Sequence, residues 1–294
     1  MIEQFLNYLR FEKNRSEKTV IRYNISLRDF QEYYKSQDEN ITWATVDADL
    51  IRGWMETMVD KGFKSVSVNA SLAAVRTFYK FALTRKLVDH DPAWQVTGPK
   101  KEKPLPQFLK EREMTELLDE QEWNDDYISV RARTIILLFY EAGLRRAELV
   151  GLDDKDVDLE AHLLKVTGKR DKQRIIPFGD ELAEELKRYV EVRNREAERC
   201  SDAFFLGKRG QRISSSVVYN IVKEQLTRVT SMKKRSPHVL RHTFATALLN
   251  NGAGLEGVKQ LLGHESLETT EIYTHTTFEQ LKRVYKDAHP RGEE

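Results

Sequence analysis

Apolar positions in the first third of the chain recur every three to four residues, the spacing of an amphipathic helix. One such segment begins at the N-terminus, and a second, SEKTVIRYNISLRDFQEYYKS, starts at Ser16, an N-cap candidate. A third runs from Asp47 to Gly62 and a fourth begins near Ser65. The fourth carries on one face Leu72, Val75, Phe78, Tyr79 and Ala82. Residues 1–96 are therefore predicted to form a small helical bundle.

The helical pattern breaks at residues 97–108, TGPKKEKPLPQF. This stretch holds three prolines, a glycine and four consecutive charged residues. Proline interrupts a helix, and so polar a stretch has little to bury. Residues 97–108 are predicted to be a linker between a domain at 1–96 and a domain at 109–294.

The second domain begins with a helical pattern through ISVRARTIILLFYEAG, followed by GLRRAEL. The period then changes to alternation in HLLKVTGKRDKQRIIPFG, where Gly168 lies among charged residues, as in two short strands joined by a turn. Beyond Asp180 the pattern is again mostly helical, except for a possible strand at Phe204 to Leu206. The predicted fold class is mainly α with a small β-sheet in the C-terminal domain.

The composition of the 294 residues, 40% hydrophobic and 32% charged, is typical of a soluble globular protein. No apolar run approaches the roughly 18 residues of a membrane span, and the N-terminus has no signal-peptide layout, so we expect a cytoplasmic protein without a membrane span. Cys200 is the only cysteine. This chain alone can therefore form neither a disulfide, nor a thiolate zinc site, nor an iron–sulfur cluster, and we expect no cofactor and no metal.

Basic residues are concentrated locally although the net charge is only +1. Residues 165–174 hold five bases against one acid, and residues 228–241 hold five bases and no acid. Such patches are candidates for contact with phosphates. Solvated surface runs are the alternative.

The segment SPHVLRHTFAT combines an N-cap candidate, Ser236, with two histidines and an arginine in the first turns of a predicted helix. Helical spacing places His238 and His242 opposite the apolar residues, so this polar set, Arg241 included, is expected to face away from the core. The zinc motif H-E-x-x-H is not met, because Val239 stands in place of its glutamate. A phosphate at the helix N-terminus is favoured over a metal, and exposed polar residues without function are the alternative.

Two further segments hold candidate chemistry. In GLRRAEL, Arg145 closely follows a buried helix that ends at Gly143, and its guanidinium needs an anion or a structural carboxylate. In LLGHESLETTEIYTH, His264 follows a glycine and Tyr273 comes nine positions later. A packed aromatic residue is the alternative for that tyrosine.

In chain order these candidates, with a lysine of the predicted turn, are Arg145, Lys169, His238, Arg241, His264 and Tyr273. At these residues the chain resembles the tyrosine recombinase family of site-specific DNA recombinases, and the Xer-type members most. The motifs that match are GLRRAEL, TGKRDKQR, HVLR and LGHESLETTEIYTH. The chain departs slightly from the family pattern, with Ala147 where relatives often carry serine and with a second base, Arg146, next to Arg145.

The resemblance implies a two-domain DNA clamp and a reaction without metal. Tyr273 would attack a DNA phosphate and form a 3′-phosphotyrosyl intermediate. Arg145, Arg241 and His264 would bind the non-bridging oxygens. The resemblance implies that Lys169 is the acid that protonates the leaving 5′ oxygen, and that His238 is the base that accepts the proton of the tyrosine.

The resemblance also implies double-stranded DNA as the partner. Candidate DNA contacts are Lys64, Ser67, Asn69, Arg76, Lys100, Lys101, Lys103, Arg170, Lys172 and Arg235. A C-terminal stripe is formed by Phe278, Leu281, Val284 and Tyr285. In the family such a stripe docks on a neighbouring subunit, so that a homo- or heterotetramer forms on two DNA sites, with a possible accessory protein; packing on its own domain is the alternative.

Several functions share this pattern. Resolution of chromosome or plasmid dimers is the expected function, and a mobile-element integrase or invertase has the same layout. A type IB topoisomerase would use the same chemistry, but the docking stripe argues against it. A DNA-binding accessory protein without catalysis is a different class, against which the presence of all six residues argues. A metal hydrolase lacks the required histidine and carboxylate spacing.

Overall fold

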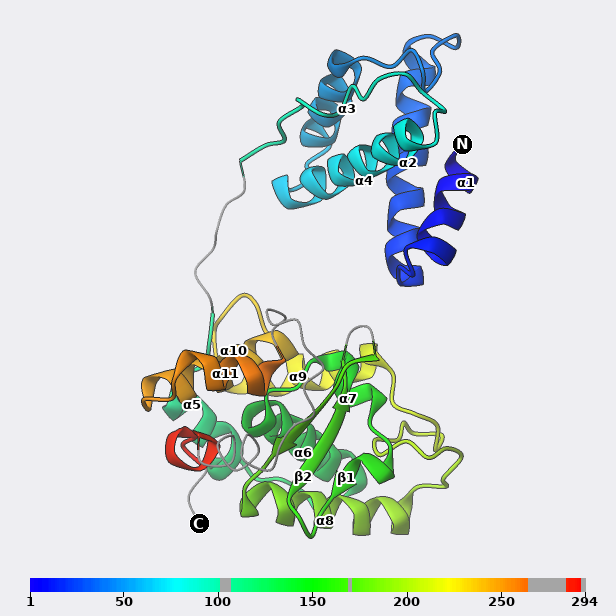
Figure 1. Cartoon of the computed structure of the whole chain (residues 1–294). Coiled ribbons are helices and arrows are strands. Elements are labelled where there is room, and N and C mark those ends of the chain that lie inside the picture. Colours follow the sequence, from blue (N-terminus) through cyan, green and yellow to red (C-terminus); the bar gives the residue numbers. More distant parts are fainter. Residues whose placement is uncertain (101–106, 169–170, 264–283, 292–294) are drawn as a thin grey trace. The chain divides into compact units, whose positions relative to one another are not determined.

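The computed structural model describes residues 1–100, 107–168, 171–263 and 284–291. The chain divides into two compact units, Met1–Pro104 and Leu105–Glu294. The division falls inside the stretch 97–108 that the sequence predicts as a linker. Figure 1 shows the elements of both units.

All regular secondary structure among the described residues of the N-terminal unit is helical. It contains α1 (Ile2–Asn7) with a π-helical turn η1 (Tyr8–Glu12), then α2 (Glu17–Gln37), α3 (Ala48–Asp60) and α4 (Ser65–Thr84). Asp47 caps α3 by accepting a hydrogen bond from the Leu50 amide. Ser16 is the N-cap residue of α2, although its side chain makes no capping hydrogen bond.

Aromatic side chains dominate the core of this bundle. Phe30, Trp43, Trp54, Phe78 and Tyr79 are buried and pack edge-on or tilted against one another. Buried polar tips find partners: Trp54 donates to Asp29, and the Tyr79 hydroxyl donates to the Trp43 carbonyl. The bundle therefore has a hydrophobic core of its own.

The C-terminal unit is built around one largely buried helix, α6 (Tyr127–Ala142), in which every residue from Thr134 to Ala142 is buried. It is preceded by α5 (Glu111–Thr115) and η2 (Glu116–Glu120) and followed by α7 (Arg146–Gly151) and η3 (Asp154–Asp156). Later helices are α8 (Asp180–Glu196), α9 (Ser215–Val229), α10 (Pro237–Asn250) and α11 (Leu255–Leu262). Helices α8, α9 and α10 all contact α6, and Figure 1 shows α8 and α10 on opposite sides of it.

A three-stranded antiparallel sheet follows η3, in the order β1 (Val157–Asp158), β2 (Leu163–Thr167) and β3 (Gln173–Pro177). Leu163 pairs with Pro177 and Thr167 with Gln173, so β2 and β3 form the hairpin that the alternating pattern predicts. The very short β1 was not predicted. The fold class, mainly helical with a small sheet in the C-terminal unit, is confirmed.

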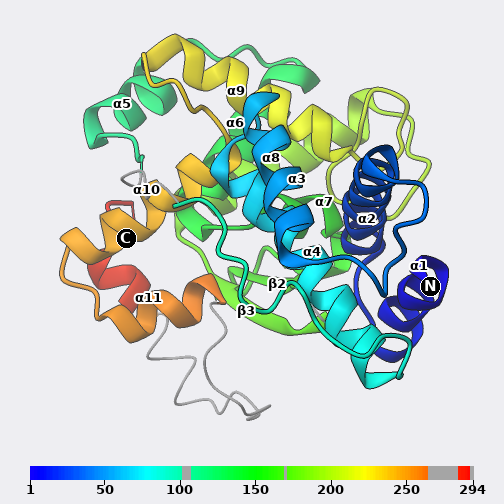
Figure 2. The same cartoon turned by 90° about the horizontal axis from the view of Figure 1, so that it is seen from above.

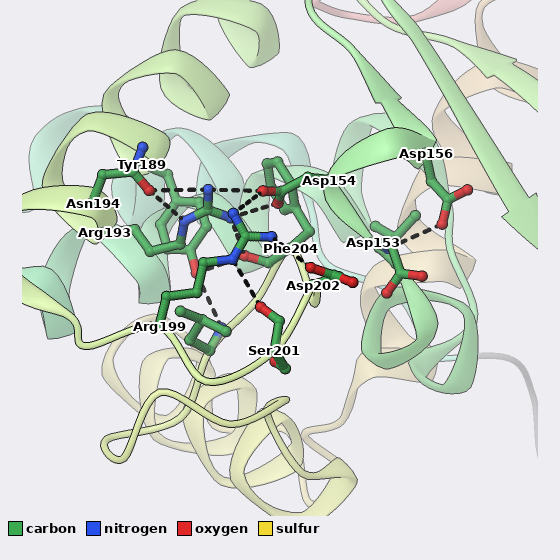
Figure 3. A network of polar contacts seen from close by, with 12 residues as sticks. Asp153, Asp154, Asp156, Tyr189, Arg193, Asn194, Arg199, Ser201, Asp202 and Phe204 are labelled. Atoms are coloured by element: carbon green, nitrogen blue, oxygen red, sulfur yellow. Dashed lines mark hydrogen bonds and ion pairs between the residues drawn. The ribbon is translucent and has the colours of Figure 1, made fainter.

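The predicted strand at Phe204 to Leu206 is wrong, since only isolated bridges occur there, at Ala203 and Leu206. Single backbone hydrogen bonds, from the Phe204 amide to the Leu152 carbonyl and from the Ile213 amide to the Phe205 carbonyl, and several side chains bind this backbone instead of a continuous strand pairing. The Phe204 carbonyl accepts hydrogen bonds from Tyr189 and Arg193, and the Leu206 amide donates to the Tyr189 hydroxyl. Figure 3 shows the network around Arg193, whose guanidinium also pairs with Asp154.

Residues 284–291 pack on their own unit. Tyr285 is fully buried against α10 and α11 and donates a hydrogen bond of 3.1 Å to a carboxyl oxygen of Glu141. His289 lies 3.1 Å from the Tyr140 carbonyl, and Arg291 pairs with Glu181 and Asp119. The two described residues of the C-terminal stripe, Val284 and Tyr285, thus contact their own domain; Phe278 and Leu281 lie outside the described residues.

In the described part of the chain, no helix is both long and apolar enough to cross a membrane.

Glu141 should make stability fall as pH rises. Burial raises the pKa of this carboxyl to about 8, so unfolding releases its proton between the normal pKa near 4.5 and 8. Within that window the free energy of unfolding should decrease by up to about 1.4 kcal/mol per pH unit. Glu141→Gln keeps an oxygen that can accept from Tyr285 but removes the titration.

Thermal unfolding of wild type and Glu141→Gln from pH 5 to 8.5 measures this. We expect the advantage of the variant to grow steadily with pH. The exposed Glu191 on α8, changed to Gln, is the matched control and should leave the pH dependence of wild type intact. Parallel curves for Glu141→Gln and wild type would contradict the assignment.

Candidate active site

The site lies where α6 ends. Gly143 follows α6 in a left-handed conformation, with φ of 58°. A Cβ atom at this position would stand 2.3 Å from a ring carbon of Phe244 in α10, so only glycine lets the chain turn this closely against α10. This turn brings Leu144 into the core and places Arg145 at the start of α7.

Arg145 is the N-cap residue of α7, and its side chain is 36% exposed. Its backbone amide and its Nη1 atom both donate to the Glu148 carboxylate, each at 2.8 Å. Nη2 donates to the Gly263 carbonyl, also at 2.8 Å. Arg145 therefore combines a held guanidinium with exposure to solvent, as an anion-binding residue requires.

Glu148 is the carboxylate at the centre of the site, and its side chain is only 2% exposed. Burial alone would raise its pKa, but hydrogen bonds from Arg174 and Arg145 outweigh burial and bring the pKa to about 2. Arg174 in β3 donates to both carboxyl oxygens, at 2.8 and 2.9 Å. Glu148 is thus ionised at any pH at which the protein would be assayed.

Arg241 in α10 completes the cluster. Its Nη1 donates to the Gly143 carbonyl at 2.5 Å, its Nη2 donates to the Leu262 carbonyl at 2.6 Å, and Glu148 lies 3.9 Å away. Burial and the charge of Arg145 lower the pKa of Arg241 to about 9, so it stays charged at neutral pH. The expectation that Arg241 faces away from the core is wrong: it is 7% exposed, because carbonyls at the ends of α6 and α11 satisfy it.

The C-terminal end of α11 binds all three arginines. The carbonyls of Leu261, Leu262 and Gly263 accept hydrogen bonds from Arg174, Arg241 and Arg145 respectively. The last carbonyls of a helix have no partners within it, and cations are favoured there by the helix dipole. Figure 2 shows the end of α11 close to β3, the strand that carries Arg174.

His238 and His242 lie exposed on the first two turns of α10, as the helical spacing predicts. Partial burial and the nearby cations Lys234 and Arg241 lower the pKa of both histidines below the usual value. His238 is therefore neutral at pH 7 and able to accept a proton. Among the described residues, no group of histidine, cysteine and carboxylate side chains has the arrangement of a metal site.

Several predicted site residues lie outside the described residues: Lys101, Lys103, Lys169, Arg170, His264 and Tyr273. The described elements nearest to them in the sequence are β2, which ends at Thr167, β3, which starts at Gln173, and α11, which ends at Leu262.

The predicted DNA contacts of the bundle divide into two groups. Lys64 is exposed and Ser67 half-buried at the start of α4. Asn69, in contrast, donates to the carbonyls of Ser65 and Pro99, and Arg76 donates to those of Ala93 and Val96. These last two side chains hold residues 93–99 against α4. Lys100 and Lys172 are exposed, and Arg235 is half-buried just before α10.

Sequence reasoning missed Arg174, which lies in a basic run but was not distinguished from its neighbours. The signal that could have found it is the alternation of the hairpin. Val166, Arg174 and Ile176 are buried, and Arg174 pairs with Val166 across the hairpin on this apolar face. A charged residue at a buried strand position needs a buried partner, and Glu148 is that partner.

Comparison with known proteins identifies the family. The model described as Phage integrase family matches residues 107–280, and the one described as Phage integrase, N-terminal SAM-like domain matches residues 2–86. The chain therefore belongs to the phage integrase family, and the resemblance noted in its motifs is confirmed.

Its relatives include proteins named tyrosine recombinase XerC and proteins named tyrosine recombinase XerD. The chain is 37% identical to tyrosine recombinase XerC of Chlorobaculum tepidum, over 98% of this chain and 94% of that protein. It is 33% identical to tyrosine recombinase XerD of Oceanobacillus iheyensis, over 99% of this chain and 98% of that protein. The XerH site-specific recombinase bound to palindromic difH substrate shares the fold, with a TM-score of 0.73, 22% identity and coverage of 96% of this chain and 83% of that chain.

Gly143→Ala should destabilise the protein by about 2 to 5 kcal/mol, the sum of left-handed strain and overpacking against Phe244. Gly252→Ala is the matched control, because Gly252 also has a positive φ, of 87°, but no atom within 4 Å of the added Cβ. At Gly252 only the strain of the left-handed backbone acts, so we expect the free energy of unfolding to fall by about 1 to 2 kcal/mol. Urea unfolding of both variants measures the difference, and equal losses would contradict the role of the Phe244 contact.

Proposed function

We propose that this protein is a site-specific DNA recombinase of the tyrosine type, which cleaves and rejoins DNA through a covalent phosphotyrosyl intermediate. The observation that carries the proposal is the arginine pair Arg145 and Arg241, held by Glu148 and by the carbonyls at the ends of α6 and α11. Two guanidiniums fixed next to each other suit the two non-bridging oxygens of a phosphodiester. The match to XerC over nearly the whole chain supports the same function.

In the proposed reaction the Tyr273 oxygen attacks the phosphorus, and the bond from phosphorus to the 5′ oxygen breaks. The product is a 3′-phosphotyrosyl bond and a free 5′-hydroxyl, and reversal with a different 5′-hydroxyl joins new partners. Negative charge grows on the non-bridging oxygens in the transition state. Arg145, Arg241 and His264 stabilise it, and each such donor contributes about 2.7 to 4 kcal/mol in comparable sites.

Proton transfer is divided between two residues in this proposal. Lys169, in the turn between β2 and β3, protonates the leaving 5′ oxygen. His238 accepts the proton of Tyr273, and its lowered pKa, caused by burial and by Lys234, keeps it in the neutral form that can do so. The family resemblance makes the assignment of acid and base, and no metal takes part.

The proposed DNA-binding surface comprises the basic residues around the site and in the bundle, with the two domains, 1–96 and 109–294, closing on the duplex as a clamp. Exposed Lys172 and Lys100 and half-buried Arg235 are in positions suited to backbone contact. Lys101, Lys103 and Arg170 continue the same basic runs, and Lys64 and Ser67 are the candidates in the bundle. Asn69 and Arg76 also bind backbone carbonyls, so their contact with DNA would add to a structural role.

We further propose that the protein works in the cytoplasm as a homo- or heterotetramer on two DNA sites, with or without an accessory protein. Resolution of chromosome or plasmid dimers is the biological role we favour, because relatives named XerC and XerD both match over nearly the full chain. A mobile-element integrase or invertase is the second candidate, since a transposon integrase shares the fold with a TM-score of 0.71.

Covalent trapping tests the chemistry. Without divalent metal, DNA that carries a recombination site with a nick beside the cleavage point should form a denaturation-resistant adduct that maps to Tyr273. Tyr273→Phe should abolish the adduct, because the attacking oxygen is removed. Tyr219→Phe, at a half-buried tyrosine of α9, is the control and should keep it. DNA binding without any adduct would favour the non-catalytic accessory protein.

Salt dependence tests the binding surface. Lys172→Ala and Arg235→Ala should each lower the slope of log Kd against log salt concentration by about one, because each contact releases roughly one counterion. The control is Lys187→Ala, an exposed lysine on α8, which Figure 1 shows on the side of α6 opposite to α10. Unchanged slopes for the first two variants would remove those residues from the DNA interface.

A further inference from the structure

Arg174 joins three elements of the catalytic unit. It belongs to β3 and is 6% exposed. Its Nη1 and Nη2 atoms donate to the two oxygens of Glu148 in α7, and its Nε atom donates to the Leu261 carbonyl of α11 at 3.0 Å. No role in the reaction described above requires Arg174 to touch DNA.

Two of the three hydrogen bonds that Arg174 makes support another residue of the site, Glu148. The Oε1 atom of Glu148 accepts a hydrogen bond from Nη1 of Arg145, and its Oε2 atom accepts one from the Arg145 backbone amide. The position of the Arg145 guanidinium therefore depends on the position of Glu148. Arg174 supplies the two other hydrogen bonds to this carboxylate. Lysine cannot replace this arrangement, because only the planar guanidinium forms two parallel hydrogen bonds and a third from Nε.

We propose that Arg174 is a positioning residue for DNA cleavage: it keeps the Glu148 carboxylate in place and ionised, and Glu148 in turn orients Arg145 toward the phosphate. The inference rests on the proposed function. The β2–β3 hairpin, which carries the proposed acid Lys169 in its turn, is joined to the phosphate-binding residues through this same arginine.

The charge of Glu148 depends on its neighbours. The charged groups that face it among the described residues are Arg145 of its own helix, Arg174 of β3 and Arg241 of α10. Burial raises its pKa and Arg174 is the strongest influence that lowers it. Without Arg174 its pKa should rise, and the carboxyl should become protonated as pH falls. A protonated Glu148 holds Arg145 less firmly, so cleavage should fall toward acid more steeply, and from a higher pH, than in wild type, where protonation of His238 alone limits it.

A second buried arginine offers a matched control. Arg193 in α8 is 2% exposed and pairs through Nη1 and Nη2 with the Asp154 carboxylate, at 2.7 and 3.2 Å. It also donates to a backbone carbonyl, that of Phe204, as Figure 3 shows. Arg193→Gln removes a similar two-bond arginine–carboxylate pair outside the site, so it reports what the loss of a buried guanidinium does to the fold alone, although Asp154 is 34% exposed and keeps Arg199 as a partner.

The first experiment measures single-turnover cleavage of nicked DNA from pH 5.5 to 8.5 for wild type, Arg174→Gln, Arg174→Lys and Arg193→Gln, at saturating protein and below each unfolding temperature. Arg174→Gln should be slowed about 100-fold at neutral pH, the size expected for misplacement of a reacting group by about 1 Å. It should be slowed further toward acid. Arg174→Lys should lose the additional fall toward acid yet stay slower than wild type, and Arg193→Gln should cleave as wild type does at every pH.

A substrate with sulfur in place of the leaving 5′ oxygen separates two routes. Thiolate leaves without protonation, so this substrate should rescue Lys169→Ala. Arg174→Gln should not be rescued, because its defect lies in phosphate binding. Rescue would mean that Arg174 acts through the hairpin on Lys169, and the route through Glu148 would be overturned.

The second experiment needs no DNA. Carbon-13 NMR of glutamate carboxyls, with the signal assigned by Glu148→Gln, should show no titration of Glu148 above pH 4 in wild type or in Arg193→Gln. In Arg174→Gln it should titrate at a higher pH. An unchanged titration, or cleavage by Arg174→Gln equal to that of Arg193→Gln, overturns the inference. Absence of any adduct from wild type instead contradicts the proposed function, and the NMR result still decides whether Arg174 keeps Glu148 ionised.

Discussion

The buried carboxylate of Glu148 is the interaction on which the catalytic unit depends. A carboxylate that is 2% exposed persists only if it is paired and hydrogen-bonded, and here each oxygen accepts from both Arg174 and Arg145. The donors come from the start of α7 and from β3, and Arg241 of α10 lies nearby. The position of the Glu148 side chain therefore determines how α7, β3 and α10 meet. The arginines, not the apolar core, specify the shape of this junction.

Much of this architecture could be predicted from residues. The apolar spacing located α2, α3 and α4, and the change to alternation located the hairpin of β2 and β3, because these patterns reflect one buried face of each element. The pattern at 204–206 predicted a strand, but this segment forms only isolated bridges, and side chains of α8, Tyr189 and Arg193, bind much of its backbone. No local pattern records such long-range donors.

The candidate site, too, was only partly predictable from the sequence. The motifs located Arg145 and Arg241, since arginine near a glycine turn or at a helix start is unusual enough to be noticed. Their partners could not be inferred, because backbone carbonyls of Gly143, Leu262 and Gly263 carry no side-chain signature. For the same reason the carbonyl partners of Arg76, those of Ala93 and Val96, could not be inferred, and its contact with DNA stays a prediction.

The carbonyls at the end of α11 have an electrostatic consequence. They accept hydrogen bonds from the three guanidiniums but carry no formal charge, so within residues 1–100, 107–168, 171–263 and 284–291 Glu148 is the one carboxylate that pairs with Arg145, Arg174 and Arg241. Three cations facing one anion leave an excess of two positive charges. A phosphodiester has one negative charge, and attack by a phenolate adds a second. The excess therefore matches the charge of the transition state better than that of intact DNA, which is the preference that a catalyst needs.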